Sequence, residues 1–223
     1  MAAPIAHVFL AVQMLAGPFK GLFNEKEFIV GTSFPDIQYL RVVSRAQTHV
    51  AQVTLEDIMR EKDSFKAGLF FHSFVDEQRE AYVVANNFYE KLPSFRFTTQ
   101  ALKFAEDEIL KSFFDSARYQ SYFDTVLAGE KAYTITQEQI KQWHLFLQGY
   151  FRGDYCGRDL VMRYFDINEP NAWRFKRFIF SWVHARKMAQ TISFVKNDER
   201  LKRLIIDFYA HFSQRFLNVS ARL

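Results

Sequence analysis

The sequence predicts an all-α protein, folded as an irregular multi-helix bundle. Apolar residues recur with the 3.6-residue period of a helix along most of the chain. The 223 residues include only 8 Gly and 5 Pro, too few for the many turns of a strand-rich fold. Helix-starting patterns such as Thr136-x-x-Gln139 support the helical interpretation. Because no repeat, low-complexity segment or long linker interrupts the pattern, we expect one domain over residues 1–223.

The composition is that of an ordinary soluble globular protein. Hydrophobic residues make up 49% and charged residues 24% of the chain, and Phe is unusually frequent at 26 residues. The apolar start, MAAPIAHVFLAVQMLAG, lacks a basic n-region and is interrupted by His7. We interpret it as a core helix rather than a signal peptide or a membrane span. The single Cys156 excludes an internal disulfide and fits a reducing compartment, so we expect a cytoplasmic protein.

The first third of the chain predicts short helices separated by defined loops. Proline, glycine and capping signals delimit the expected helices, which are Pro4–Leu15, Glu25–Val30 and Thr54–Arg60. Pro35 stiffens the loop after the second of them and holds the next residue, Asp36, at a defined angle. Asp36 is either a functional side chain presented by this loop or the N-cap of a helix that starts at Ile37.

The stretch Ser64–Tyr89 predicts a long central helix that carries a polar pair on its apolar face. At about 100° per residue, one narrow face contains Phe65, Leu69, His72, Asp76 and Val83. His72 and Asp76 are four residues apart and converge on one point. Each needs a partner, because a buried lone imidazole or carboxylate is costly.

Two interpretations of this pair follow from the residues alone. His72 and Asp76 either form a buried hydrogen-bonded pair or share a metal ion, which satisfies both at once. Gly68, one turn before His72, removes a side chain and allows another backbone or a ligand to come close. On this stretch alone the hydrogen-bonded pair is favoured, since short motifs often match by chance.

Amphipathic helices are expected along the rest of the chain. Capping residues and apolar periodicity mark their ranges, which are Thr98–Phe114, Ser116–Leu127, Thr136–Phe151, Arg158–Tyr164, Glu169–Ile192 and Asp198–Asn218.

Residues 171–223 carry 11 Lys+Arg and 3 Asp+Glu, a balance of +8, whereas residues 1–170 carry 18 and 22, a balance of −4. The basic residues alternate with Trp and Phe, so this region is a candidate for contact with an anionic membrane surface. The alternative is that the aromatics are core residues and the cations a solvated face.

Common nucleotide-binding and nucleophile motifs are missing from the sequence. It contains no GxxxxGK[ST] loop, GxGxxG, GxSxG, CxxC or HD dipeptide. A set of metal-binding residue types remains in the first third of the chain, with three of the six His residues. His and carboxylate side chains suit Zn²⁺. The candidate ligands are His7, Asp36, His49, His72 and Asp76.

The order of these segments resembles the zinc-dependent phospholipase C family and the related S1/P1-type nucleases. The matching segments are PIAHVFLA, FIVGTSFPDI, THV and AGLFFHSFVD, and they cover about residues 4–80. The resemblance implies an all-α fold of the phospholipase C/P1 nuclease type. It also implies that Asp36, His49, His72 and Asp76 surround one zinc ion and that Asp76 bridges to a second zinc near His7.

The same resemblance implies a phosphodiester hydrolase, most simply one that acts on phospholipid head groups. Asp36 would act as general base or orient the attacking water. A third zinc site of the family is expected to be lost, because no His lies between His72 and His144. His144, His184 and His211 are interpreted as packing or surface residues, with His184 the strongest candidate among them for an additional ligand.

Two function classes therefore remain open at the level of sequence. One is a hydrolase with one or two zinc ions that acts on a phospholipid or another phosphodiester, with no specific nucleic acid expected as a partner. The other is a non-catalytic binding or scaffolding protein with a structural or vestigial metal site. A structural site is closed by four protein ligands, whereas a catalytic site keeps an open position. The oligomeric state is left undetermined by the sequence.

Overall fold

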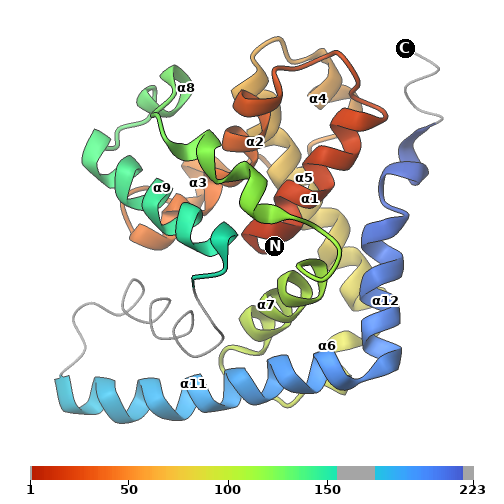
Figure 1. Ribbon diagram of the computed structural model, residues 1–223, viewed down its shortest axis with the longest axis vertical. Helices are drawn as coiled ribbons and strands as arrows, with labels where there is room; N and C mark the ends of the chain where they lie inside the picture. The colour runs from red at the N-terminus through yellow and green to blue at the C-terminus, as the bar shows by residue number, and fades with distance from the viewer. Residues whose placement is uncertain (1, 155–173, 218–223) are drawn as a thin grey trace.

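The computed structural model describes residues 2–154 and 174–217, and every regular element within these ranges is a helix (Figure 1). This confirms the predicted all-α, multi-helix fold class. The side chains of residues 174–182 are not described. Within the described residues, no helix is both long enough and apolar enough to cross a lipid bilayer.

The elements follow one another closely along the chain. Their bounds are α1 (Pro4–Ala16), α2 (Glu25–Ser33), the 3₁₀ helix η1 (Pro35–Leu40), α3 (Arg45–Thr48), α4 (Leu55–Arg60), α5 (Ser64–Ala85), α6 (Phe88–Lys91), α7 (Thr98–Leu110), the 3₁₀ helix η2 (Ser116–Phe123), α8 (Ala128–Lys131), α9 (Gln137–Arg152), α11 (Arg174–Asn197), α12 (Glu199–Ala210) and the 3₁₀ helix η3 (Ser213–Phe216).

Side-chain caps begin several of these helices where the sequence predicts them. The capping boxes of Thr54 with Asp57 and Thr136 with Gln139 are both formed. Asp198 accepts the backbone N–H groups of Arg200 and Leu201, which opens α12. Each cap satisfies backbone donors that have no partner inside the helix.

Some predicted helix ends are wrong, and local backbone geometry explains the main one. The central helix ends at Ala85 rather than Tyr89, because Asn87 adopts a left-handed conformation with φ 53° and starts the separate helix α6. The helix predicted as Thr98–Phe114 ends at Leu110. The predicted helix Ser116–Leu127 is the 3₁₀ helix Ser116–Phe123.

Other differences concern the second half of the chain. The helix predicted over Arg158–Tyr164 lies outside the described residues, as does the first part of Glu169–Ile192. The described part of that helix, α11, continues to Asn197. The helix predicted from Asp198 to Asn218 ends at Ala210, and the short η3 follows.

Two glycines allow α2 and α5 to pack with their backbones in close contact. A Cβ atom on Gly31 would lie 2.0 Å from the carbonyl oxygen of Phe65, and one on Gly68 would lie 2.1 Å from that of Phe28. The Thr32 hydroxyl donates a hydrogen bond to Gly68 O at 3.0 Å across the same contact. The close approach expected at Gly68 is thus made by another helix, and it places the end of α2 beside His72.

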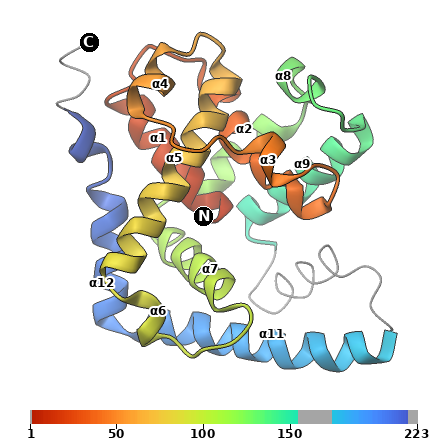
Figure 2. The ribbon, with the colours of Figure 1, turned by 180° about the vertical axis from the view of Figure 1, so that it is seen from behind.

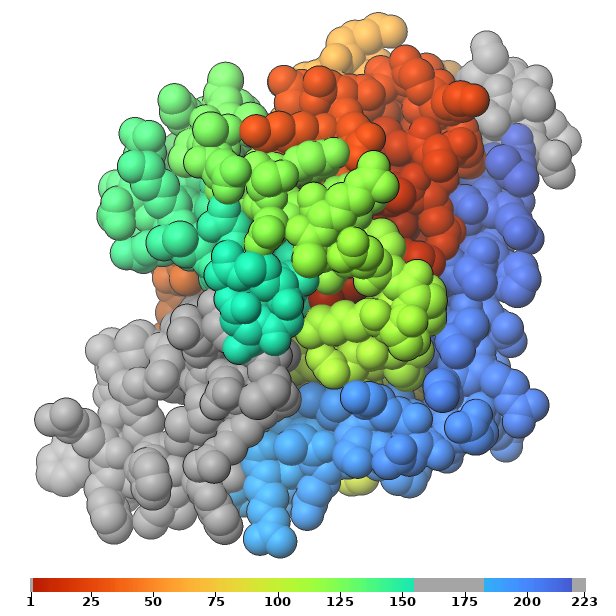
Figure 3. Space-filling model, in the orientation of Figure 1, coloured from red at the N-terminus to blue at the C-terminus, as the bar shows by residue number. Residues whose placement is uncertain are grey.

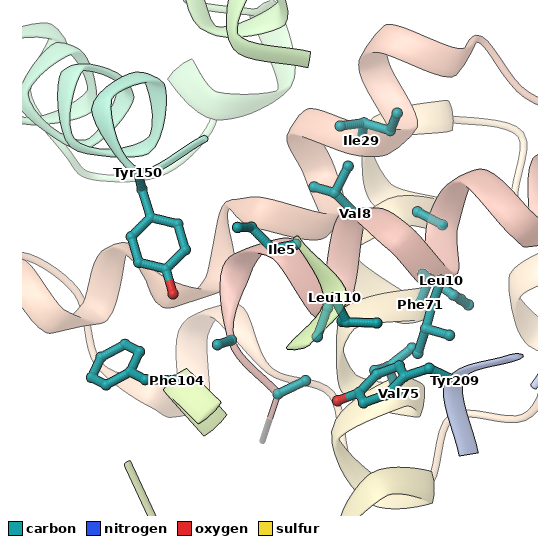
Figure 4. Packing of buried hydrophobic residues seen from close by; sticks show 14 of the residues in the cluster. Ile5, Val8, Leu10, Ile29, Phe71, Val75, Phe104, Leu110, Tyr150 and Tyr209 are labelled. Carbon is teal, nitrogen blue, oxygen red and sulfur yellow. The ribbon is translucent and has the colours of Figure 1, made fainter. Parts of the chain in front are cut away.

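The helix α1 lies in the middle of the molecule and supplies much of its core. Figure 4 shows Leu10 of this helix beside Phe71 of α5 and Val8 toward Ile29 of α2. The helix α7 packs on α1 from one side and on α11 from the other. Seen from both sides, α11 runs along one edge of the molecule, and α12 turns away from its end (Figures 1 and 2). In Figure 3, η2 and α7 cover part of the N-terminal helices.

Buried polar groups connect this core. Arg79 of α5 donates two hydrogen bonds to Glu106 of α7, at 2.8 and 2.7 Å, and both side chains are almost fully buried. Tyr209 of α12 donates to the same carboxylate at 2.7 Å. The network joins three helices at Arg79, about one turn after Asp76 on α5, so the position of that helix is strongly constrained.

Candidate metal centre

The five candidate ligands predicted from the sequence come together in the interior. They arrive from four parts of the chain: His7 from α1, Asp36 from η1, His49 from the residue that ends α3, and His72 and Asp76 from α5. All except His49 are buried, and the His49 side chain is only 7% exposed. Two groups of three could hold a metal ion, namely His7–His72–Asp76 and Asp36–His49–His72.

Asp76 lies at the centre of the cluster and presents a different oxygen to each side. Its Oδ2 atom is 3.6 Å from His72 Nε2 and 3.7 Å from His49 Nε2. Its Oδ1 atom is 3.3 Å from His7 Nε2 and accepts a hydrogen bond from the backbone N–H of Ala2 at 2.7 Å. A carboxylate with this arrangement can ligate one metal ion and can also bridge two.

The interpretation of His72 and Asp76 as a hydrogen-bonded pair is wrong. Their closest described polar atoms are 3.6 Å apart, which exceeds hydrogen-bond length. The pair is instead part of a larger cluster, in which His72 also stacks on His7 with ring centroids 3.9 Å apart. The pair is therefore not joined by a direct bond, and a shared metal ion is the interpretation that stays open.

The backbone of α2 sets the orientation of His72. Its Nδ1 atom lies 2.8 Å from the carbonyl oxygen of Thr32. A carbonyl only accepts hydrogen bonds, so Nδ1 carries the proton in the neutral ring. The lone pair is then on Nε2, which points into the cluster. This arrangement, in which one ring nitrogen donates to a backbone oxygen, is typical of a metal-ligating histidine.

Thr48 orients His49 in a similar way. The Thr48 hydroxyl donates to the carbonyl oxygen of Pro35 at 3.3 Å, and its oxygen lies 3.1 Å from His49 Nδ1. The hydroxyl can therefore accept from an Nδ1–H group, which leaves the His49 lone pair on Nε2. His49 Nε2 is only 3.1 Å from His72 Nε2. If His49 carries its proton on Nε2, it donates a hydrogen bond to His72 Nε2. If it carries the proton on Nδ1, the two lone pairs face each other and can share a cation.

The distances match the spacing of metal ligands. Ligand atoms about 2.0–2.1 Å from a tetrahedral ion such as zinc lie about 3.3–3.4 Å from one another. The three separations among His49 Nε2, His72 Nε2 and Asp76 Oδ2 are 3.1, 3.6 and 3.7 Å. Only small side-chain movements are needed for these three atoms to surround one ion.

Asp36 lies on the other side of the cluster and has an unsatisfied oxygen. Its Oδ1 atom is buried without a hydrogen-bond partner among the described residues. The alternative role of Asp36 as an N-cap is wrong, because it lies inside η1, which begins at Pro35 and has Phe34 at the N-cap position. Burial raises the pKa of Asp36, with Lys103 opposing this effect. A nearby cation would stabilise the carboxylate.

The two oriented histidines are held in the neutral form that binds metals. Burial is the main cause that lowers the pKa of His49 to about 4, and the neighbouring Arg45 adds to it. Burial also lowers the pKa of His72 well below its ordinary value, and His7 acts in the same direction. The rings therefore do not have to lose a proton at neutral pH before they can ligate an ion.

An open pocket adjoins the cluster on the side of His49 and Asp76. It has a volume of about 740 Å³ and is lined mainly by α3, α5 and the loop after α3. Arg45 lies at this pocket, with Nη2 3.4 Å from Asp76 Oδ2 and a side chain 47% exposed. A ligand in the pocket would meet both the candidate metal ligands and a cationic side chain.

The three later histidines are not part of either candidate metal group in the described residues. His144 is buried and lies 2.7 Å from Glu130. His211 is exposed beside its own helix backbone. His184, the strongest sequence candidate among them, packs edge-on against Phe97. The interpretation as packing and surface residues is therefore confirmed for the described residues.

Sequence reasoning missed the residues that orient the cluster. The Thr32 carbonyl and the Thr48 hydroxyl reach the two histidines only through tertiary contacts. The one local signal was that Thr32 follows Gly31, a residue type that allows two helix backbones to approach closely. Lys103 of α7 was also missed, although it is buried beside Asp36. A single Lys on a predicted amphipathic helix gives no signal of this kind.

Comparison with known proteins adds no relative: no family model, curated protein or solved structure matches this chain. The phospholipase C/P1 nuclease-like fold therefore stays a prediction from the order of the ligand segments.

Proposed function

We propose that the protein is a metal-dependent, most simply zinc-dependent, phosphodiester hydrolase. The observation that carries the proposal is the convergence of His49 Nε2, His72 Nε2 and Asp76 Oδ2 within 3.1–3.7 Å. With the proton on Nδ1 of each ring, both lone pairs point inward, and a pocket opens beside them. The substrate is a phospholipid head group or another phosphodiester.

Zinc fits the donor set best. Two imidazole nitrogens with one or two carboxylates are common zinc ligands, whereas magnesium and calcium prefer oxygen ligands throughout. Asp76 Oδ1 and His7 Nε2, 3.3 Å apart, offer part of a second position. One or two zinc ions are therefore proposed, with Asp36, His49, His72 and Asp76 around the first and His7 with Asp76 at the second.

The chain's own residues would position the reactants. A bound zinc ion would polarise a phosphoryl oxygen and lower the pKa of water. Asp36, whose Oδ1 atom has no other partner in the described residues, is the group proposed to orient the attacking water or accept its proton. The pocket, which is lined by Arg45 and also by Glu77 and Glu80, would give the substrate access to the metal ligands.

A non-catalytic metal site is the second candidate, and burial is the observation in its favour. His72 is fully buried, and Asp36 and Asp76 are each only 4% exposed. Four protein ligands could close the site and leave no position for water. The pocket beside His49 and Asp76 favours the catalytic alternative, because a scaffold needs no such access.

The test is hydrolysis of a chromogenic phosphodiester and of phospholipid vesicles by zinc-loaded protein. We expect turnover that disappears on chelation and returns with zinc. Asp36→Asn should lower kcat by about 100-fold or more while the protein stays folded, because the two side chains are nearly isosteric. His211→Ala, on an exposed residue away from the cluster, is the matched control. No turnover by the zinc-loaded protein would favour the scaffolding alternative.

Contact with an anionic membrane surface through residues 171–223 is part of the proposal. The notable Trp, Phe and basic residues at 173–182 lie outside the described side chains. Among the described residues, Arg186, Lys187, Arg200 and Arg203 are exposed. A lipid-hydrolysing enzyme needs a surface that docks on a bilayer.

A further inference from the structure

Lys103 is a buried cation with almost no partners. It lies on α7 and is 4% exposed. Its one hydrogen bond among the described residues is a long one, 3.4 Å to the hydroxyl of Tyr39. An ammonium group carries three donors and is seldom buried without a counter-charge. The hydrogen-bonding capacity of this ammonium group is therefore largely unused. Burial lowers the pKa of Lys103, and the carboxylates of Asp36 and Asp76 oppose this effect.

Lys103 lines a small cavity on the Asp36 side of the metal centre. The cavity has a volume of about 40 Å³, and its lining includes Asp36, Tyr39 and the aromatic residues Phe104, Trp143 and Tyr150. A space of this size holds two or three water molecules or a few oxygen atoms of a ligand. Its polar side chains are Lys103, Tyr39, Gln100 and Asp36, and its other walls are apolar.

The nearby carboxylates do not form a close ion pair with Lys103. Asp36 and Asp76 are the anionic groups that act most strongly on it. No ion pair shorter than 4.0 Å joins it to either of them in the described part of the chain. Lys103 is close enough to influence the metal centre and far enough to leave room for a third group.

The charge balance of the site indicates that this third group is an anion. With neutral histidines, the two carboxylates of Asp36 and Asp76 offset the charge of one divalent ion. The charges of Lys103 and of Arg45, which lies 3.4 Å from Asp76 Oδ2, then remain and give the one-ion site a net charge of about +2. A phosphodiester carries one negative charge on its non-bridging oxygens. Lys103 does not line the larger pocket beside His49 and Asp76. Its ammonium donors therefore complement a phosphate oxygen that reaches past the metal ligands into the small cavity on the Asp36 side.

We propose that Lys103 binds the phosphate group of the substrate and stabilises its developing charge during hydrolysis. The inference rests on the proposed function and adds to it a residue that contacts substrate. Lys103 acts on the phosphate oxygens alone. It ligates no metal, and it neither donates nor removes a proton in the reaction. The substrate is recognised by its phosphate through this residue, whatever alcohol the phosphate carries.

A structural role is the competing account. In that account, Lys103 only offsets the charge of Asp36, and its replacement changes zinc binding or stability but not phosphate binding. Lys103→Met keeps the length and volume of the side chain and removes the charge. Lys111→Met, at the residue that caps the C-terminus of the same helix, is the matched control, because Lys111 is paired with Glu108 at 2.9 Å and is partly exposed.

The experiment is isothermal titration of zinc-loaded protein with inorganic phosphate, with the zinc content of each sample measured. We expect wild type and Lys111→Met to bind phosphate alike and Lys103→Met to bind it about tenfold or more weakly at unchanged zinc content. Equal binding by Lys103→Met, or no binding by the wild type, overturns the proposal.

A second variant keeps the proposal testable if Lys103→Met does not fold. Lys103→Gln keeps a donor but no charge, and it should show the same loss of phosphate binding. If neither variant folds, the proposal is contradicted, because a residue kept for anion binding is dispensable for folding. The outcome for the proposed function is independent of this test. A protein that binds phosphate through Lys103 but cleaves no phosphodiester would contradict the proposed hydrolase and would still support the phosphate site.

Discussion

The Nε2 atoms of His49 and His72 lie 3.1 Å apart, and the Nδ1 atom of each ring faces an oxygen atom. Thr32 and Thr48 supply those oxygens from two different segments of the chain. With the His49 proton on Nδ1, both lone pairs point to the same place, which is also within 3.7 Å of Asp76 Oδ2. In this tautomer the two rings can ligate one metal ion, whereas with the proton on Nε2 His49 donates a hydrogen bond to His72.

The contact between α2 and α5 should be essential for both stability and metal binding. Gly68→Ala would place a Cβ atom 2.1 Å from the carbonyl oxygen of Phe28 and push the two helices apart. We expect a loss of about 3 kcal/mol in the free energy of unfolding, the upper end for an overpacked site. Zinc affinity should fall as well, because Thr32 O moves away from His72. Urea denaturation and zinc titration measure the two effects.

Val84→Ala is the control for the glycine substitution. Val84 lies on the same helix and is 57% exposed, so its truncation should change stability by less than about 0.5 kcal/mol. A Gly68→Ala protein as stable as the wild type would show that the close helix contact is not required.

The buried pair of Arg79 and Glu106 should respond asymmetrically to substitution. Arg79→Met leaves the Glu106 carboxylate buried with only the Tyr209 hydroxyl as a described side-chain donor. We expect a loss of roughly 3–5 kcal/mol in the free energy of unfolding. The double substitution Arg79→Met with Glu106→Gln removes both charges and should recover at least half of this loss. Chemical denaturation measures both, and an equally unstable double variant would contradict the account.

The sequence predicts the site better than the details that support it. The spacing of His72 and Asp76 on an apolar face of a helix, together with Gly68, places the core of the cluster correctly. Local signals also locate the capped helix starts, as at Thr136. The early end of α5 depends on the left-handed backbone of Asn87, a conformation that many Asn residues do not adopt.

What the sequence could not predict depends on tertiary packing. Which backbone carbonyl faces His72 follows from how closely α2 approaches α5, and that distance is not encoded in either helix alone. Lys103 occupies a position that local pattern assigns to a helix but not to the interior. Its burial follows from the neighbours of α7 on several sides.

Asp107 should make stability depend on pH. It accepts hydrogen bonds from the backbone N–H groups of Ile5 and Ala6 and from Tyr150, yet burial raises its pKa from 3.8 to about 7. Between about pH 4 and pH 7 the folded protein then keeps a proton that the unfolded chain has lost. The contribution of Asp107 to the free energy of unfolding is therefore fully present below about pH 4. It decreases by on the order of 1 kcal/mol per pH unit as the pH rises to 7.

The test is the difference in unfolding free energy between wild type and Asp107→Asn in the absence of metal. Asn cannot titrate, so the difference isolates Asp107 from other groups. The stability of the wild type relative to the variant should decrease as pH rises from about 4 to about 7 and be constant outside this window. A difference that does not change with pH would contradict the raised pKa.

The basic C-terminal region should bind anionic membranes in a salt-dependent manner. Each cation near an anionic bilayer contributes on the order of 1 kcal/mol, screened within a Debye length of about 8 Å at physiological salt. Sedimentation with vesicles should show binding to anionic lipid that falls steeply with added salt and no binding to neutral lipid. Replacement of Arg200 and Arg203 by Gln should weaken it. Equal binding to both vesicle types, or none at low salt, would reject this part of the proposal.

The most direct test of the account is the zinc content of the purified protein. After reconstitution with zinc and removal of unbound metal, elemental analysis should find at least about one zinc ion per wild-type chain. The double variant His49→Ala with His72→Ala should retain almost none, whereas His211→Ala should match the wild type. A wild-type protein that retains no zinc, or a double variant that retains as much as the wild type, would contradict the central claim that these two histidines hold a metal ion.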